Sequence, residues 1–398
     1  MVSHLIFTDF YSKKFQKMKY SSDSEDNKKE TIYTYYFTEQ EKYAKIYGSK
    51  TLVFIQIGKF YEAYCTRKKG YVNLAELEPL LNIKFIRRDD KPIKDGKPPK
   101  PNQFGINCVA ISKNLSIMVN HGYTVVLFDQ KSDGETIERE CVGVYSPGTY
   151  LSDIQMQEAN YLLSVYISEE KQLTCNKNLM AIGLSLVDIS TGTNIIHEFY
   201  SNKFDERFGL DELVRMMQTF RPVESVIYYH PVNIDESAIK NVKLYLELDK
   251  YHNVHFYIYH NNKGEDALNL LTENSFKINF QNDYLAQIYE MNNQLTLNKK
   301  QSPLEILGLE RRNYAAVSLM MMLKYIAEHN VLLLKNLSYP EIYLYNKHLI
   351  LGNNAIEQLN VIDSNNLELY NSKISSVFDV INKTPNTPNL SLIHISEP

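Results

Sequence analysis

Residues Phe54–Tyr64 read FIQIGKFYEAY, and this stretch decides how the first part of the chain folds. It continues an apolar run, Thr51–Ile57, that stops at Gly58. A β-branched and aromatic run ending in glycine is typical of a buried strand followed by a sharp turn. Beyond the turn, Phe60 and Glu62 stand two residues apart, so in an extended or turn backbone both side chains point the same way, which a helix would not allow. The sequence therefore predicts a buried strand and a sharp turn, followed by an aromatic ring beside a carboxylate.

Such a pair of side chains suits two different roles. As a wedge, Phe60 could enter between stacked bases while Glu62 makes one hydrogen bond to a base edge. Lys59, a cation at the same turn, would favour phosphates. In the alternative interpretation, the stretch is the end of an amphipathic strand and Phe60 belongs to the core.

The composition is that of an ordinary globular protein. The 398 residues, 23% charged and 44% hydrophobic, are enough for two or three domains that each bury a core. A formal net charge of -4 gives no global nucleic-acid signal, so any contact with DNA must come from local basic patches. No apolar stretch approaches the roughly 18 residues of a membrane span. No secretory signal is evident, and no membrane partner is expected.

The four cysteines, Cys65, Cys108, Cys141 and Cys175, are far apart and form no C-x-x-C pair. This spacing indicates reduced thiols rather than a metal site or a disulfide framework. We therefore expect an intracellular, reducing compartment, without distinguishing cytoplasm, nucleus, viral factory and mitochondrion.

From residue 38 to residue 150, strands and helices alternate over about 110 residues, which indicates a small mixed α/β domain. Before it, residues 1–37 are expected to be flexible, because Ser21–Glu30 is polar and charged without apolar anchors. Thr38 and Glu41 have the spacing of a capping box for a short helix over Glu39–Tyr47. The further expected elements are a helix over Asn73–Leu81, a strand start at Ile83–Ile86, strands over Gln103–Ile111, Tyr123–Asp129 and Cys141–Tyr145, and a helix over Asn114–Gly122.

One segment of this domain is strongly basic. Residues 84–103 hold seven cations against three acids, a local net charge of +4, and four prolines with a glycine exclude regular structure. As an arm, the segment would touch phosphates in a salt-sensitive way; as a plain surface insertion, it would only be solvated. The cations are Lys84, Arg87, Arg88, Lys91, Lys94, Lys97 and Lys100.

A second α/β unit and a helical region follow. Ala181–Thr191 and Asn194–Tyr200 are expected to be two strands joined at Gly192. Leu210, Leu213, Val214 and Met217 recur at helical spacing, and Val226–Tyr229 reads as the next strand. From about Phe280 the strands are expected to stop, with helices over Asp283–Leu297 and Glu310–Leu333.

Several of these motifs resemble, in order, those of the MutS family of DNA mismatch repair proteins. GKFYEAY is similar to the Gly-x-Phe-Tyr-Glu signature of the mismatch-recognition tip. A Gly-Tyr-x-Val-x-x-x-x-Gln strand and a Ser-Pro-Gly-Thr turn then close the first domain. Within the family, the sequence most resembles the branch of large DNA viruses and organelles. The matching segments are Gly58–Tyr64, Gly122–Gln130, Ser146–Thr149, Gly183–Gly192 with Pro222-x-Glu224, Ile350–Val361 and Ser376–Thr387.

The resemblance implies an α/β plus all-α architecture. A small mixed α/β mismatch-recognition domain would occupy residues 38–150, and a ribonuclease-H-like α/β connector domain would occupy residues 151–265. The start of an α-helical core or lever domain, truncated, would occupy residues 266–390. The last segment, 391–398, looks like a non-native tail.

For the site, the resemblance implies that Phe60 stacks on a mispaired or unpaired base and that Glu62 bonds that base. Lys59 departs from the aspartate common in the family, and the family's Gly-Val-Pro-Tyr segment is reduced to Gly105–Asn107. The implied partner is double-stranded DNA containing mismatches. A complete member of the family would be a homodimeric ATPase using ATP and Mg²⁺.

The sequence also allows two functions other than mismatch recognition. In nucleases with the ribonuclease H fold, the first strand carries a metal-binding aspartate, so Asp188 with Glu198 and Glu212 could form a Mg²⁺-dependent nuclease site. Alternatively, Asp188 only bonds the amides of its own turn. The other rival is a protein-interaction module that does not bind DNA.

The chain itself is expected not to be an enzyme and to hold no cofactor or metal. Residues 48–51, GSKT, imitate the end of a phosphate-binding loop, but the earlier glycine and the preceding strand are missing.

Overall fold

The computed structural model describes residues 25–66, 70–88, 100–132, 137–150, 160–172, 177–251, 253–260, 263–264, 270–291, 301–344, 358–361, 376–377 and 380. The chain divides into two compact units, one built mainly from residues up to Tyr150 and the other mainly from residues after it. Both units are mixed α/β, which confirms the sequence prediction at that level. The finer domain boundaries and their functional assignments stay predictions.

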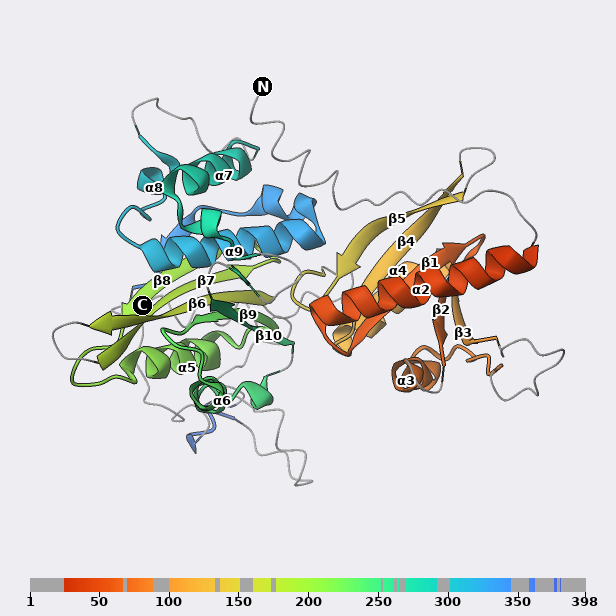
Figure 1. Ribbon diagram of the computed structural model, residues 1–398, viewed down its shortest axis with the longest axis horizontal. Helices are drawn as coiled ribbons and strands as arrows, with labels where there is room; N and C mark the ends of the chain where they lie inside the picture. Colours follow the sequence, from red (N-terminus) through yellow and green to blue (C-terminus); the bar gives the residue numbers. More distant parts are fainter. Residues whose placement is uncertain are drawn as a thin grey trace. The chain divides into compact units, whose positions relative to one another are not determined.

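The first unit is a five-stranded sheet with the strand order β3-β2-β1-β4-β5 and helices packed against it (Figure 1). β1 pairs antiparallel with β2 and parallel with β4, so it lies at the centre. The strands are β1 (Thr51–Ile57), β2 (Phe60–Cys65), β3 (Asn102–Asn107), β4 (Thr124–Ser132) and β5 (Ile137–Tyr145), and the helices are α2 (Glu25–Tyr47), α3 (Tyr71–Leu81) and α4 (Ile111–Asn120).

The apolar run Thr51–Ile57 forms this central strand. Val53, Phe54 and Ile55 of β1 are all completely buried. A strand covered on both faces needs apolar side chains at successive positions, which is why the run does not alternate with polar residues.

The helix before β1 is longer than the sequence predicted. α2 begins at Glu25, so the part of the expected flexible segment from Glu25 to Phe37 is helical, and that prediction is wrong there. Thr38 lies inside the helix, where its hydroxyl donates to the Thr34 carbonyl at 2.9 Å, and it caps nothing. Packing outweighs the polar composition, because Tyr36 and Tyr43 are buried and Gln40 bonds the backbone of β1. Residues 1–24 lie outside the described residues.

Two other expected strands of this unit are shorter than predicted. Ile83–Ile86 contributes a single bridge, between Ile86 and Gln103. β3 ends at Asn107 and passes into a 3₁₀ turn, η1 (Cys108–Ala110), before α4.

The second unit is a seven-stranded sheet with the order β11-β10-β9-β6-β7-β8-β12. In Figure 1, α5 and α6 lie on one side of this sheet and α9 on the other. Its elements are β6 (Tyr161–Gln172), β7 (Lys177–Asp188), β8 (Asn194–Tyr200), β9 (Glu224–His230), β10 (Val254–His260), β11 (Lys263–Gly264), β12 (Pro340–Ile342), α5 (Phe208–Phe220), α6 (Glu236–Tyr245), α7 (Ile278–Met291), α8 (Pro303–Ile306) and α9 (Asn313–His329), with short 3₁₀ turns η2 (Leu248–Lys250), η3 (Glu273–Phe276) and η4 (Val331–Asn336).

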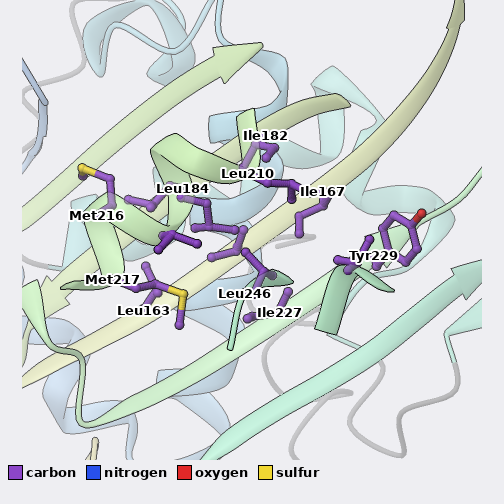
Figure 2. Packing of buried hydrophobic residues seen from close by; sticks show 14 of the residues in the cluster. Leu163, Ile167, Ile182, Leu184, Leu210, Met216, Met217, Ile227, Tyr229 and Leu246 are labelled. Atoms are coloured by element: carbon purple, nitrogen blue, oxygen red, sulfur yellow. The ribbon is translucent and has the colours of Figure 1, made fainter. Parts of the chain in front are cut away.

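The core of this unit lies between the sheet and α5. Figure 2 shows Leu163 and Leu184 from the strands packed with Leu210, Met216 and Met217 from the helix. All five side chains are buried. Burial on the helical face explains why apolar residues recur there at helical spacing.

The predicted hairpin of this unit is confirmed, and its glycines have a packing reason. β7 and β8 pair antiparallel around Gly192, whose φ is 78°. A Cβ at Gly183 would lie 2.0 Å from the Tyr314 carbonyl, at the start of α9. A Cβ at Gly192 would lie equally close, 2.0 Å, to the carbonyl oxygen of Asn336. Both glycines therefore let the helical region pack directly on the hairpin.

The expectation that strands stop near Phe280 is wrong, because β12 pairs in parallel with β8. A three-residue strand at a sheet edge is too short to leave a periodic signal in the sequence. The expected helix over Asp283–Leu297 corresponds to α7, which begins earlier, at Ile278, and residues 292–297 lie outside the described residues. The expected helix over Glu310–Leu333 is present in shorter form as α9. Most of Ile350–Val361 and Ser376–Thr387, and all of residues 391–398, lie outside the described residues. Over the parts of the chain that the structure describes, no helix combines the length and apolar character needed to cross a membrane.

Candidate nucleic-acid interface

The tip of the first unit is the two-residue turn between β1 and β2. Ile57 faces Phe60 in the register, so Gly58 and Lys59 form the whole loop. Gly58 has a φ of 60°. A positive φ at the first central position is what the tight hairpin turns that match strand twist require, and glycine adopts it without steric cost.

Side chains from two strands hold this turn. The Gly58 N–H donates to Oε1 of Gln130 at 3.2 Å, and the Gln130 N–H donates to Oε1 of Gln56 at 2.9 Å. Nε2 of Gln56 donates to the Gly58 carbonyl at 3.2 Å. From the other side, the Cys108 N–H donates to the Lys59 carbonyl at 3.0 Å. The turn is therefore fixed at both of its residues.

Phe60, Glu62 and Tyr64 alternate along β2 and so share one face of the sheet. Phe60 is 45% exposed, Glu62 is half-buried and Tyr64 is 4% exposed. Exposure falls along this row because α2 covers its far end, where Tyr33 and Tyr36 meet the Tyr64 ring edge-on at 4.9 and 5.2 Å. The hydroxyl of Tyr64 donates to Oε2 of Glu62.

The opposite face of β2 anchors the strand. Tyr61, Ala63 and Cys65 are buried, and the hydroxyl of Tyr61 donates to Asp129 on β4. Burial, followed by this hydrogen bond, raises the pKa of Tyr61. With alternate residues held in the core, Phe60 is kept on the outer face.

The neighbouring edge strand leaves space beside the carboxylate. Glu62 faces Gly105 and Phe60 faces Asn107 in the register between β2 and β3. A Cβ placed on Gly105 would meet no atom within 4 Å. The site is thus a projecting ring and a half-buried carboxylate next to open space, which a flat group such as a base could enter.

The predicted backbone-contacting cations differ in their surroundings. Lys59 and Lys100 are exposed, Lys59 at the turn itself. Arg87 is engaged by Glu78 at 2.7 Å, and this ion pair lowers the pKa of Glu78. The backbone N–H of Arg88 donates to Asn102 at 2.6 Å. Lys91, Lys94 and Lys97 lie outside the described residues.

The structure does not assemble the alternative nuclease site. Asp188 is buried and accepts from the Ser190 N–H at 2.9 Å and from both hydroxyls of its turn, Ser190 at 2.6 Å and Thr191 at 2.9 Å. Glu198 accepts the N–H groups of Tyr314 and Ala315, at the N-terminus of α9, at 2.8 and 2.9 Å. These bonds support the interpretation of Asp188 as a turn-forming residue.

Glu212, the third carboxylate of that alternative, pairs with Arg215 on its own helix. Among the residues that the structure describes, no three His, Cys, Asp or Glu side chains gather closely enough to hold a metal ion.

The sequence prediction above does not single out three residues that support the tip: Gln56, Gln130 and Tyr64. Gln130 ends a motif that resembled the family, but its bond to Gly58 spans 72 positions and leaves no local signal. Tyr64 could have been found, because it continues the alternation that singled out Phe60 and Glu62.

Residues 37–154, which include the tip, match the family model of MutS domain I. A DNA mismatch repair protein MutS from Caldanaerobacter subterraneus subsp. tengcongensis is 25% identical over 352 residues, which is 86% of this chain and 33% of the relative. The MutS of Methanosarcina mazei is 29% identical over 44% of this chain and 19% of its own length. That of Thermotoga petrophila is 30% identical over 40% and 18%.

The chain thus contains a segment that matches MutS domain I, and over most of its length it is similar to DNA mismatch repair proteins MutS. It spans about a third of the length of the first of these relatives. Among solved structures, an Argonaute from Aquifex aeolicus aligns with a TM-score of 0.19 and 10% identity over 43% of this chain and 26% of its own, which is too weak to bear on the fold.

Proposed function

We propose that the first unit of this chain recognises mispaired or unpaired bases in duplex DNA, as the N-terminal part of a MutS-like protein acting in mismatch repair. Domain I and the MutS relatives support a role in repair. The observation that carries the recognition step is Phe60, 45% exposed on a strand whose alternate residues are buried. The buried residues on either side fix the strand, so the ring faces outward.

In this proposal Phe60 acts as a wedge at one base step. Inserting an apolar side chain unstacks the step and kinks the duplex, at a cost of about a few kcal/mol. The cost is smaller where pairing is already defective, so the preference for a mispair arises from this saving rather than from reading a sequence. Glu62, two residues along the same face, bonds the edge of the displaced base.

Cations near the tip supply affinity that does not depend on sequence. Lys59 stands exposed at the turn, directly beside Phe60. An ammonium group there would contact a phosphate and release a counterion, so binding to any duplex would weaken as salt rises. Lys100 and Arg88 are further candidates for such contacts.

Other properties expected of a complete family member are proposals for the whole protein. They are an ATPase activity with ATP and Mg²⁺, a homodimer, and work inside a reducing compartment. The relation to the viral and organellar branch is likewise a prediction. In this scheme the part of the protein described above binds DNA, and no reaction is assigned to it.

The test compares affinity for a duplex containing one G·T mispair with affinity for its matched twin at fixed salt. We expect tighter binding to the mispair, and we expect Phe60→Ala to reduce the ratio of the two affinities to about one. Phe204→Ala is the matched control, because Phe204 is 89% exposed in the second unit. Equal binding to both duplexes by the unmodified chain, or a ratio that survives Phe60→Ala, would contradict the proposal.

A further inference from the structure

The hydrogen bond between Tyr64 and Glu62 joins two side chains on the same face of β2, next to Phe60. The Tyr64 ring is 4% exposed and rests against Tyr33 and Tyr36 of α2. Its hydroxyl is therefore a donor held in a fixed place by the core of the unit. Glu62, by contrast, is only half-buried and would otherwise sample several rotamers.

The direction of this hydrogen bond is set by protonation. Burial, followed by the bond to Glu62, raises the pKa of Tyr64, so the phenol keeps its proton at neutral pH. A protonated phenol donates, and the carboxylate oxygen accepts. Hydrogen bonds to a charged acceptor are the stronger kind, which suits a role in fixing a side chain.

The bond uses one oxygen of the carboxylate and leaves the other available. Oε2 of Glu62 accepts the hydrogen bond from the Tyr64 hydroxyl, and the part of the chain that the structure describes brings no second donor to Glu62. The space over Gly105, which faces Glu62 on β3, is open. The remaining oxygen can therefore accept a hydrogen bond from an incoming group.

We propose that Tyr64 is a positioning residue for mismatch recognition: its hydroxyl holds Glu62 beside Phe60, with one carboxylate oxygen presented to an N–H group of the displaced base. This inference rests on the proposed function. Tyr64 itself does not touch DNA in this arrangement. It acts through the carboxylate, and its removal should weaken only the step in which that carboxylate takes part.

The test is Tyr64→Phe, which keeps the buried ring and deletes the hydroxyl. We expect the ratio of mismatch to matched affinity to fall by roughly 2- to 10-fold, the range given by the net worth of one hydrogen bond. Affinity for the matched duplex should not change. A merely structural role of Tyr64 would instead lower both affinities together.

Tyr123→Phe is the matched control. The Tyr123 hydroxyl donates to Glu76 in the same unit, and Tyr123 directly precedes β4, at the end of the sheet where β1 starts rather than where it turns into β2. Tyr123→Phe removes a tyrosine–glutamate hydrogen bond that lies away from Phe60, so this variant should leave the ratio of mismatch to matched affinity unchanged.

A double-mutant cycle with Glu62→Ala, which removes the acceptor, separates an action through the carboxylate from an independent one. If Tyr64 acts through Glu62, adding Tyr64→Phe to Glu62→Ala should change the affinity ratio by less than twofold. Equal effects of Tyr64→Phe in the two backgrounds would overturn the inference, as would an unchanged ratio in Tyr64→Phe alone. Failure of the proposed function is distinguishable, because it appears as a ratio near one in the unmodified chain or as insensitivity to Phe60→Ala.

Discussion

The backbone N–H of Gly58 donates to the side-chain oxygen of Gln130 at 3.2 Å, across 72 positions of the sequence. This bond ties the turn that carries Phe60 to the end of β4. Together with the bonds made by Gln56, it fixes the tip from the core of the sheet rather than from the turn itself.

Replacing Gln130 by alanine should therefore loosen the tip. Gly58 would lose its acceptor, and Phe60 would no longer be held at one angle. We expect Gln130→Ala to lower the ratio of mismatch to matched affinity several-fold while the unit stays folded, as followed by circular dichroism. Gln130→Glu retains an acceptor oxygen and should keep most of the ratio; an equal loss in both variants would speak against the hydrogen bond as the cause.

Gly105 gives a test of the open space beside Glu62. Its Cβ would meet nothing within 4 Å, and glycine in a strand interior is not otherwise favoured. We expect Gly105→Leu to change the free energy of unfolding by less than about 1 kcal/mol. It should nevertheless abolish the preference for a mispair, because its side chain fills the space proposed for the base. Gly105→Ala, being smaller, should retain part of the preference; a full preference in Gly105→Leu would place the base elsewhere.

Substituting Gly183, which is also a strand glycine, should destabilise the fold, whereas substituting Gly105 should not. A Cβ there would lie 2.0 Å from the backbone of Tyr314, which cannot move without shifting α9. We expect Gly183→Ala to lower the free energy of unfolding by about 1–3 kcal/mol or more, as overpacking does. Urea denaturation measures this, with Gly105→Ala as the matched substitution. Equal stability of the two variants would contradict the close packing of α9 on β7.

The buried tyrosines of the first unit predict a loss of stability in alkali. Burial raises the pKa of Tyr36, Tyr43 and Tyr64 above the ordinary value of 10.0. Above that pH the unfolded chain ionises these phenols and the folded chain does not, so the free energy of unfolding falls as pH rises. The urea midpoint of the unit should be constant from pH 7 to 9 and should decrease beyond about pH 10. A midpoint that stays level to pH 11 would disagree with these shifts.

The central strand and the turn after it could be predicted from the sequence because their signal is local. The spacing of Phe60 and Glu62 predicted that their side chains point the same way, and the structure confirms this by placing both on one face of β2. The start of α2 could not be predicted, because polar residues 25–30 join a helix that is stabilised by tyrosines further along. β6 was missed although residues 162–168 are almost entirely buried, since a short apolar run alone does not distinguish strand from helix. The pairing of Gln130 with Gly58 exists only in the folded sheet.

The insertion of Phe60 is tested most directly with a fluorescent base. A duplex would carry 2-aminopurine next to a G·T mispair, where stacking quenches its emission. If Phe60 enters the stack, adding the protein should raise the emission of the mismatched duplex but not that of the matched one, and Phe60→Ala should abolish the rise at saturating protein. An equal rise with Phe60→Ala, or no rise while the mismatched duplex is fully bound, would contradict the wedge.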